Sequence, residues 1–327
     1  MKLHKIIISL TAVLVLTATA LSFAKPKKKT QPKSGLKIVT TIFPEYDWVK
    51  QILGNTAKDA ELTLLLDNGV DLHSYQPSVQ DIAKISSADI FIYVGGESDR
   101  WVVDVLKTAH NKELTAINLL ETLGDRVKEE ELVEGMQAED DEEEEDEEPE
   151  YDEHVWLSLK NAQFLCEAIS AVLCEKDAAN AAAYSANLAA YLKQLKALDA
   201  AYAAAASASR TKTVLFGDRF PFRYLVDDYG LSYYAAFVGC SAETEASFKT
   251  VVFLAEKVDE LGLNYVFKIE SGNDKIARTI IQNSKRKQAK ILTLDSLQST
   301  TARDIKQGST YLGAMQKNLE VLKTALK

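Results

Sequence analysis

Cysteine, histidine and clustered basic residues are all scarce in this sequence. Its 327 residues include three cysteines and four histidines, and the isoelectric point lies near 5.1. No segment is basic enough to suggest nucleic-acid binding, and no H-E-x-x-H or similarly compact motif supplies the metal and general base of a hydrolase. We therefore expect neither a nucleic-acid partner nor an enzyme.

The three cysteines are Cys166, Cys174 and Cys240. Cys166 and Cys174 lie on one predicted helix, where their spacing corresponds to about 12 Å of rise, too far for a disulfide. An exported protein can form disulfides, but the odd count and this spacing favour buried free thiols.

Residues 1–24 have the pattern of a signal peptide. Lys2 and Lys5 precede an apolar stretch, and Ser22-Phe23-Ala24 matches a small-x-small cleavage site. No cysteine lies near that junction, so the acylated anchor of a bacterial lipoprotein has no attachment point. We expect export to the periplasm or another extracytoplasmic space, with the apolar segment either cleaved or kept as an anchor. A basic flexible leader is expected over residues 25–35.

Negative charge is concentrated in one run. The fifteen residues from Glu139 to Glu153 carry thirteen carboxylates and no base, which predicts a mobile, solvated loop over residues 137–153. The run leads without a spacer into His154. Two interpretations stay open: a solubilising surface insertion, or a collector of divalent cations beside a binding histidine.

Strand and helix signals alternate from residue 36 onward, which predicts an α/β fold with largely parallel sheets. The predicted strands are 36–41, 61–66, 89–94 and 114–119 in the first half and 213–216, 232–238, 265–269 and 290–294 in the second. Between the halves, residues 178–206 include fifteen alanines and no glycine or proline, which is typical of one long helix.

These signals predict two lobes, each a mostly parallel sheet flanked by helices. We expect an N-terminal lobe over residues 36–177, a rigid linking helix over 178–208 and a C-terminal lobe over 209–327. A ligand is expected in the cleft between the lobes.

Candidate ligand residues follow predicted strands in both lobes. His73 and His154 follow strands of the first lobe, the second across the acidic loop, while Asp295 and Asp218 follow strands of the second lobe. Ligands lie at the carboxyl ends of parallel strands. Two imidazoles with carboxylates suit a first-row divalent ion such as zinc or manganese.

Two segments resemble those of a known family. Residues 71–78, DLHSYQPS, are similar to the segment "DPHxYxPS", and residues 152–157, DEHVWL, are similar to "DPHVWLDP", both from metal-binding receptors of bacterial ABC-type zinc and manganese importers. Gly95-Gly96-Glu97 with Trp101, the alanine-rich helix and Leu294-Asp295-Ser296-Leu297 also fall where that family has counterparts, so the similarity covers residue 36 to the C-terminus.

The resemblance implies two lobes joined by a rigid helix, with the ion bound in the cleft. It carries over His73 and His154 as ligands and Asp295 as the carboxylate of the second lobe. The expected function is an extracytoplasmic solute-binding protein that captures zinc, with manganese as the alternative. It would deliver the ion as a monomer to the membrane permease of an ABC importer.

The third ligand position departs from the family. Where the family has histidine or glutamate, this sequence has Arg219, which cannot ligate a cation because it stays protonated. Three alternatives follow: Asp218 supplies an oxygen ligand, a water molecule or a loop carboxylate completes the coordination shell, or Arg219 pairs with Asp295. We favour Asp218 as the ligand, with Glu270 as the reserve candidate. The competing hypothesis is an exported receptor for a small anion, in which Arg219 and Arg223 face the cleft.

Overall fold

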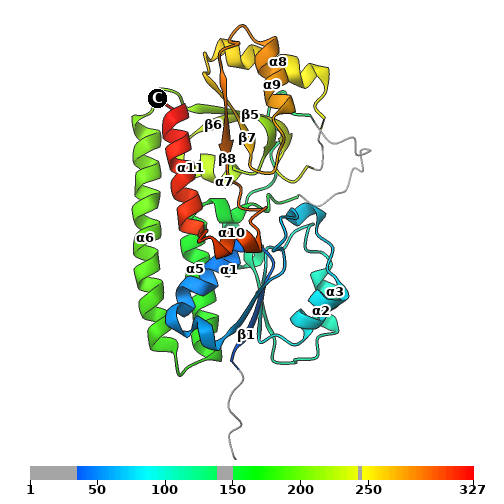
Figure 1. The fold of residues 1–327 in the computed structure, drawn as a ribbon, viewed down its shortest axis with the longest axis vertical. Helices are drawn as coiled ribbons and strands as arrows, with labels where there is room; N and C mark the ends of the chain where they lie inside the picture. The colour runs from blue at the N-terminus through cyan, green and yellow to red at the C-terminus, as the bar shows by residue number, and fades with distance from the viewer. Residues whose placement is uncertain (1–34, 138–149, 242–244) are drawn as a thin grey trace, which may run out of the picture. The chain divides into compact units, whose positions relative to one another are not determined.

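Two four-stranded parallel sheets organise the chain. The computed structural model describes residues 35–137, 150–241 and 245–327, which belong to one compact unit, Gly35–Lys327 (Figure 1). The predicted signal peptide, the leader up to residue 34 and residues 138–149 of the predicted acidic loop lie outside the described residues. Within the described part, no helix combines the length and the apolar character that a membrane span requires.

The first sheet has the strand order β2-β1-β3-β4 and the second the order β6-β5-β7-β8. The strands of the first sheet are β1 (Lys37–Thr40), β2 (Glu61–Leu64), β3 (Ile90–Tyr93) and β4 (Thr115–Asn118). Those of the second are β5 (Thr213–Phe220), β6 (Ser232–Val238), β7 (Tyr265–Ile269) and β8 (Lys290–Leu294). All neighbouring strands are parallel, which confirms the predicted two-lobed α/β class.

Helices connect the strands of each sheet. In the first half they are α1 (Phe43–Leu53), α2 (Val79–Ser86), α3 (Val102–Lys107), α4 (Leu119–Leu123) and α5 (Leu159–Lys176), with short 3-10 helices at Leu72–Ser74 and Val155–Leu157. In the second half they are α7 (Arg223–Tyr229), α8 (Phe248–Glu260), α9 (Lys275–Asn283), α10 (Ala302–Lys306) and α11 (Tyr311–Ala325).

The alanine-rich segment forms the predicted long helix, α6 (Ala181–Ala208). Its 28 residues extend over about 42 Å, and it contacts α1 and α5 from the first half and α7 and α11 from the second (Figure 1). Its buried side chains include Tyr184, Tyr191 and Tyr202, and the Tyr202 hydroxyl donates to the Met315 carbonyl at 2.6 Å. The helix therefore fixes one half to the other along its length.

One hydrophobic core runs through both halves. It includes Trp48 and Trp156 from the first half and Phe216 and Tyr311 from the second. The Trp156 indole donates to the Ser296 carbonyl at 2.9 Å, and the Tyr311 hydroxyl donates to the Trp156 carbonyl at 2.6 Å. The chain just after His154 is therefore anchored in the second half.

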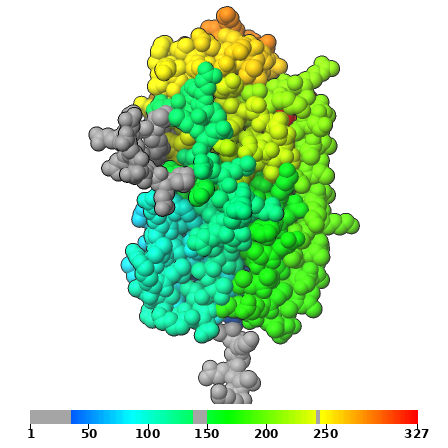
Figure 2. All heavy atoms as spheres, turned by 180° about the vertical axis from the view of Figure 1, so that it is seen from behind, coloured from blue at the N-terminus to red at the C-terminus, as the bar shows by residue number. Residues whose placement is uncertain are grey.

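The segment after α4 also crosses to the second half. The Gln137 backbone N–H donates to the Ala236 carbonyl at 3.0 Å, and Arg223 forms an ion pair with Glu131 at 2.9 Å. Figure 2 shows this teal segment lying over the yellow residues of the second half. All three cysteines are free, as predicted, although only Cys166 is fully buried.

Candidate metal centre

His73 and His154 are each fixed by an aspartate two residues earlier. His73 lies in the 3-10 helix Leu72–Ser74, and its backbone N–H donates to Asp71 at 3.1 Å. His154 immediately precedes the 3-10 helix Val155–Leu157, and its backbone N–H donates to Asp152 at 2.8 Å. In both Asp-x-His segments, the aspartate side chain therefore fixes the backbone that carries the imidazole.

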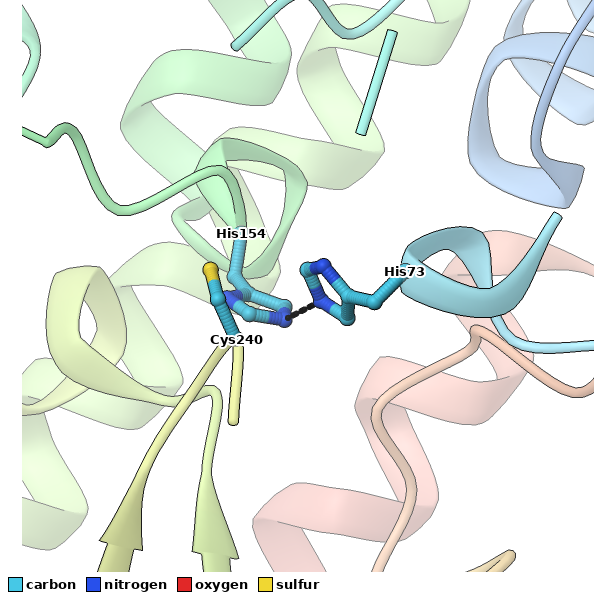
Figure 3. Close-up of side chains that lie close together, drawn as sticks. All are labelled: His73, His154 and Cys240. Carbon is cyan, nitrogen blue, oxygen red and sulfur yellow. Dashed lines mark hydrogen bonds between the residues drawn. The ribbon is translucent and has the colours of Figure 1, made fainter. Parts of the chain in front are cut away.

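The two imidazoles meet through their Nε2 atoms, which lie 3.1 Å apart (Figure 3). Both Nδ1 atoms are already engaged: that of His154 with Asp152 Oδ1 at 3.0 Å, and that of His73 with Ser98 Oγ at 2.8 Å. A hydrogen bond at the far nitrogen sets the tautomer and orientation of a metal-binding histidine. Both Nε2 atoms are thus directed at one point.

Burial controls the protonation of His73. The side chain of His154 is fully buried and that of His73 is 9% exposed. Burial, followed by the charge of His154, lowers the pKa of His73 to about 3. Neutral imidazole is the form that binds metal, so His73 is ready to accept a cation at physiological pH.

The third member of the cluster is Cys240, which was predicted only to be a buried free thiol. Among the described residues, His73, His154 and Cys240 form a group whose ligand atoms all lie within 4.8 Å of one another (Figure 3). Cys240 follows the end of β6 by two residues. Its position after a second-half strand is the signal that could have identified it, because the same rule selected the other candidates.

Asp218 lies outside this group. Its Oδ1 accepts a hydrogen bond from the Arg219 backbone N–H at 2.9 Å, and its Oδ2 accepts one from the Ile269 N–H at 3.1 Å. Its carboxylate also abuts Gly272, where an added Cβ would lie 2.0 Å from Oδ2. Asp218 therefore joins β5 to the end of β7, and this arrangement gives no support to its prediction as a ligand.

Asp295 also lies outside the group. It lines a separate cavity of about 320 Å³ together with Glu270, and burial, followed by the charge of Glu270, raises the pKa of Asp295 to about 6. Glu270 accepts hydrogen bonds from Ser296 and Ser299 and so holds the loop after β8. The prediction of Asp295 as a ligand, like the reserve choice of Glu270, gains no support from this arrangement.

Arg219 pairs with Asp71 and not with Asp295, which corrects one of the three alternatives for the third ligand. Its Nη2 lies 2.6 Å from Asp71 Oδ2, and its Nη1 donates to the Ser241 carbonyl at 3.3 Å. Burial would raise the pKa of Asp71, but the Arg219 guanidinium and then His73 outweigh it, and this pKa is lowered. The ion pair connects β5 to the loop that carries His73.

Carboxylates surround the histidine pair. Glu153 is 2% exposed; its Oε1 accepts from the Ser98 N–H at 2.9 Å, and its Oε2 lies 3.5 Å from His73 Nδ1. Burial raises the pKa of Glu153 to about 7. Gly96, with φ of +74°, allows this contact, because an added Cβ would lie 2.3 Å from Glu153 Oε1.

A cavity of about 240 Å³ opens beside the cluster. Its lining consists of His73, Glu97, Ser98, Glu130, Glu150, Tyr151, Glu153 and Cys240. Four of these side chains are glutamates, so the cavity attracts cations and disfavours anions. The two arginines of the anion hypothesis are engaged elsewhere, Arg219 with Asp71 and Arg223 with Glu131 and Asp227.

Comparisons with known proteins agree with one another. The profile of the family described as "Zinc-uptake complex component A periplasmic" (ZnuA) matches residues 38–325. The zinc-binding lipoprotein AdcA of Streptococcus pneumoniae serotype 4 is 33% identical over 315 residues, 95% of this chain and 60% of AdcA. The high-affinity zinc uptake system protein ZnuA of Bacillus subtilis is 29% identical over 294 residues, 89% of this chain and 88% of that protein.

A solved structure extends this similarity to the fold. The crystal structure of the Zn(II)-bound ZnuA-like domain of S. pneumoniae AdcA matches with a TM-score of 0.69 and 31% identity, over 89% of this chain and 99% of that domain. The chain spans about three fifths of the length of the AdcA relatives it matches.

Proposed function

The chain belongs to the ZnuA family of periplasmic zinc-uptake components, as the two histidine segments indicated, and from this membership we propose that it is an extracytoplasmic receptor for zinc. In this proposal it captures one Zn²⁺ ion at the histidine pair and releases it unchanged to the membrane permease of an ABC importer. Zinc is the cargo of this process, and no reaction is catalysed.

The observation that carries the proposal is the distance of 3.1 Å between the Nε2 atoms of His73 and His154. Two imidazole nitrogens bound to one tetrahedral zinc ion at about 2.05 Å lie about 3.3 Å apart. The pair therefore needs to open by only a few tenths of an ångström to accept the ion. The hydrogen bonds at both Nδ1 atoms support the same orientation in the free protein.

Zinc is favoured over manganese by the ligand chemistry. Imidazole nitrogen is a good ligand for zinc, whereas manganese prefers carboxylate, carbonyl and water oxygens. The relatives are named for zinc as well. We keep manganese as the alternative ion, and a calorimetric comparison of the two ions decides between them.

Export and delivery complete the proposal. The predicted signal peptide over residues 1–24 and the family's description as periplasmic both support an extracytoplasmic location. The anion-receptor alternative is not favoured, because both of its arginines are paired with carboxylates.

Calorimetric titration of the chelator-stripped protein with zinc tests the function. We expect one tight site that His73→Ala and His154→Ala each weaken at least tenfold. His110→Ala is the matched control, since its imidazole bonds to Ser86 at 2.7 Å and is no member of the cluster. Equal zinc affinity in the wild type and the His73→Ala/His154→Ala double variant would refute the site.

A further inference from the structure

Cys240 is the one member of the ligand cluster to which the proposed function gives no task. It comes from the second half of the molecule, whereas both histidines come from the first. Figure 3 shows its thiol beside the His154 ring, on the side of that ring away from His73. A receptor that binds its ion between two halves needs a ligand from each of them, and Cys240 is the member of the group that the second half supplies.

The chain around Cys240 is built to hold the thiol at this place. Gly239 lies against the His154 ring, where an added Cβ would be 2.9 Å from Cε1, so a residue with a side chain would push the loop away. The Cys240 backbone N–H donates to Glu130 Oε1 at 3.1 Å. On the other side, Arg219 donates to the Ser241 carbonyl at 3.3 Å. The thiol is therefore positioned from both sides, and Arg219 assists without ligating.

A buried carboxylate beside the histidine pair also points to a cation at this position. Glu153 Oε2 has no hydrogen-bond partner among the described residues, although Glu153 is only 2% exposed. A cation at the histidine pair would compensate this oxygen by charge, as carboxylates behind metal-binding histidines do. This second observation points to the same position as the cluster of ligand atoms.

We propose that Cys240 is the third protein ligand of the captured ion, bound as a thiolate beside Nε2 of His73 and Nε2 of His154. The inference rests on the proposed function and deepens it by assigning a ligand from the second half. In a tetrahedral site with N₂S ligands, sulfur and nitrogen lie about 3.6 Å apart. The ligand atoms of the present group all lie within 4.8 Å of one another, so the group contracts when it binds the ion.

The binding step is an exchange of a proton for a metal ion. The S–H bond of Cys240 breaks, an S–Zn bond forms, and the proton passes to the Glu130 carboxylate, which already contacts the Cys240 backbone, and then to water. A bound dication deprotonates a coordinating thiol outright. No electrons are transferred, so the site stays reduced throughout.

The thiolate would also determine metal specificity. Soft sulfur ligands favour zinc and disfavour manganese, which prefers oxygen. Replacing sulfur by oxygen at residue 240 should therefore weaken zinc binding much more than manganese binding. Cys240 would then set the preference for zinc, while the histidines provide affinity for several ions.

Cobalt is the spectroscopic probe, because a thiolate bound to Co²⁺ gives a sulfur-to-metal charge-transfer band in the near ultraviolet that nitrogen and oxygen ligands do not give. The chelator-stripped, reduced chain without its signal peptide is titrated with Co²⁺, and zinc affinity is measured by calorimetry. Cys174→Ser is the matched control, since Cys174 is a partly buried free thiol outside the cluster.

We expect the band in the wild type and in Cys174→Ser, its loss in Cys240→Ser, and at least tenfold weaker zinc binding in Cys240→Ser alone. Tight zinc binding by the wild type without the band, and with Cys240→Ser unchanged, would overturn the ligand assignment and leave the receptor function standing. Absence of zinc binding in the wild type would instead refute the function.

Should Cys240→Ser fail to fold, thiol alkylation of the wild type decides. Peptide mass spectrometry then follows iodoacetamide labelling of Cys240 and Cys174 with and without zinc. Zinc should protect Cys240 at least tenfold and leave Cys174 unchanged, and equal labelling of Cys240 with and without zinc would overturn the proposal.

Discussion

Glu45, in the first turn of α1, gives the structure its most direct test by pH. It is fully buried, and its Oε2 accepts hydrogen bonds from the Thr41 N–H at 2.9 Å, the Thr41 hydroxyl at 3.1 Å and the Ile42 N–H at 3.3 Å. Its Oε1 has no hydrogen-bond partner among the described residues. Burial, followed by the negative charge of Asp99, raises the pKa of Glu45 from 4.5 to about 8.

The sign of the effect follows from proton binding. Because the folded protein holds this proton more tightly than the unfolded chain, the stabilisation from Glu45 is complete below pH 4.5 and is lost as pH rises toward 8. At about 1.36 kcal/mol per pH unit, the loss amounts to about 3 kcal/mol at pH 7 and about 1 kcal/mol at pH 5. Glu45 alone should therefore reduce the free energy of unfolding by about 2 kcal/mol between these two values.

Glu45→Gln removes the ionisation while keeping the shape of the side chain. We expect the unfolding free energy of the wild type to fall by about 2 kcal/mol more between pH 5 and pH 7 than that of Glu45→Gln. The assay is urea unfolding at both values in the presence of a chelator, with Glu61→Gln, an exposed carboxylate on β2, as the control. Contributions from His73 and Glu153 are the same in both proteins and cancel. An identical pH dependence in wild type and Glu45→Gln would refute the reasoning.

Three further predictions concern the site and its surroundings. Tyr224→Phe removes a donor to the Asp152 carbonyl at 2.8 Å and an acceptor for the Lys128 N–H at 3.0 Å. It should therefore destabilise the fold by about 1–3 kcal/mol in urea unfolding and weaken zinc binding. The control, Tyr265→Phe, should do neither. Ser98→Ala frees the Nδ1 of His73 and should weaken zinc binding about tenfold in calorimetry with little change in stability; unchanged affinity would show that Ser98 does not orient the ring. Deleting residues 138–149, which carry much of the acidic run, should slow zinc association in stopped-flow measurements at low salt yet leave the equilibrium affinity within about twofold, and a large loss of affinity would place a ligand in that run.

The sequence predicts most of the fold because strand and helix periods are local. The strands β6, β7 and β8 have the predicted bounds. The five-residue helix α4 was missed, since its first residue, Leu119, also continues the apolar pattern of the preceding strand. The helix begins there because the Asn118 side chain accepts a hydrogen bond from the Glu121 N–H, a capping contact that outweighs the strand pattern.

The end of β5 shows why the candidate site was harder to predict than the fold. The strand was expected to stop at Phe216 but continues to Phe220, with a register shift between Phe216 and Arg219. The extension depends on pairing with β6, a contact between distant parts of the sequence. The bulge then changes the face of the sheet on which each side chain lies. Asp218 therefore bonds to the end of β7, and Arg219 pairs with Asp71. Proximity to the strand end had instead suggested Asp218 as the metal ligand.

The same physical distinction separates the histidines from Cys240. His73 and His154 could be paired from sequence because each lies two residues after an aspartate whose side chain bonds the backbone of that histidine. This local relation is repeated in both segments. Cys240 acquires its place only through contacts with distant chain, namely Glu130 and the ring of His154. Arginine at residue 219 then has a physical consequence beyond the loss of a ligand: its guanidinium spans Asp71 and the Ser241 carbonyl, and so it draws the loop of His73 and the loop of Cys240 toward one another.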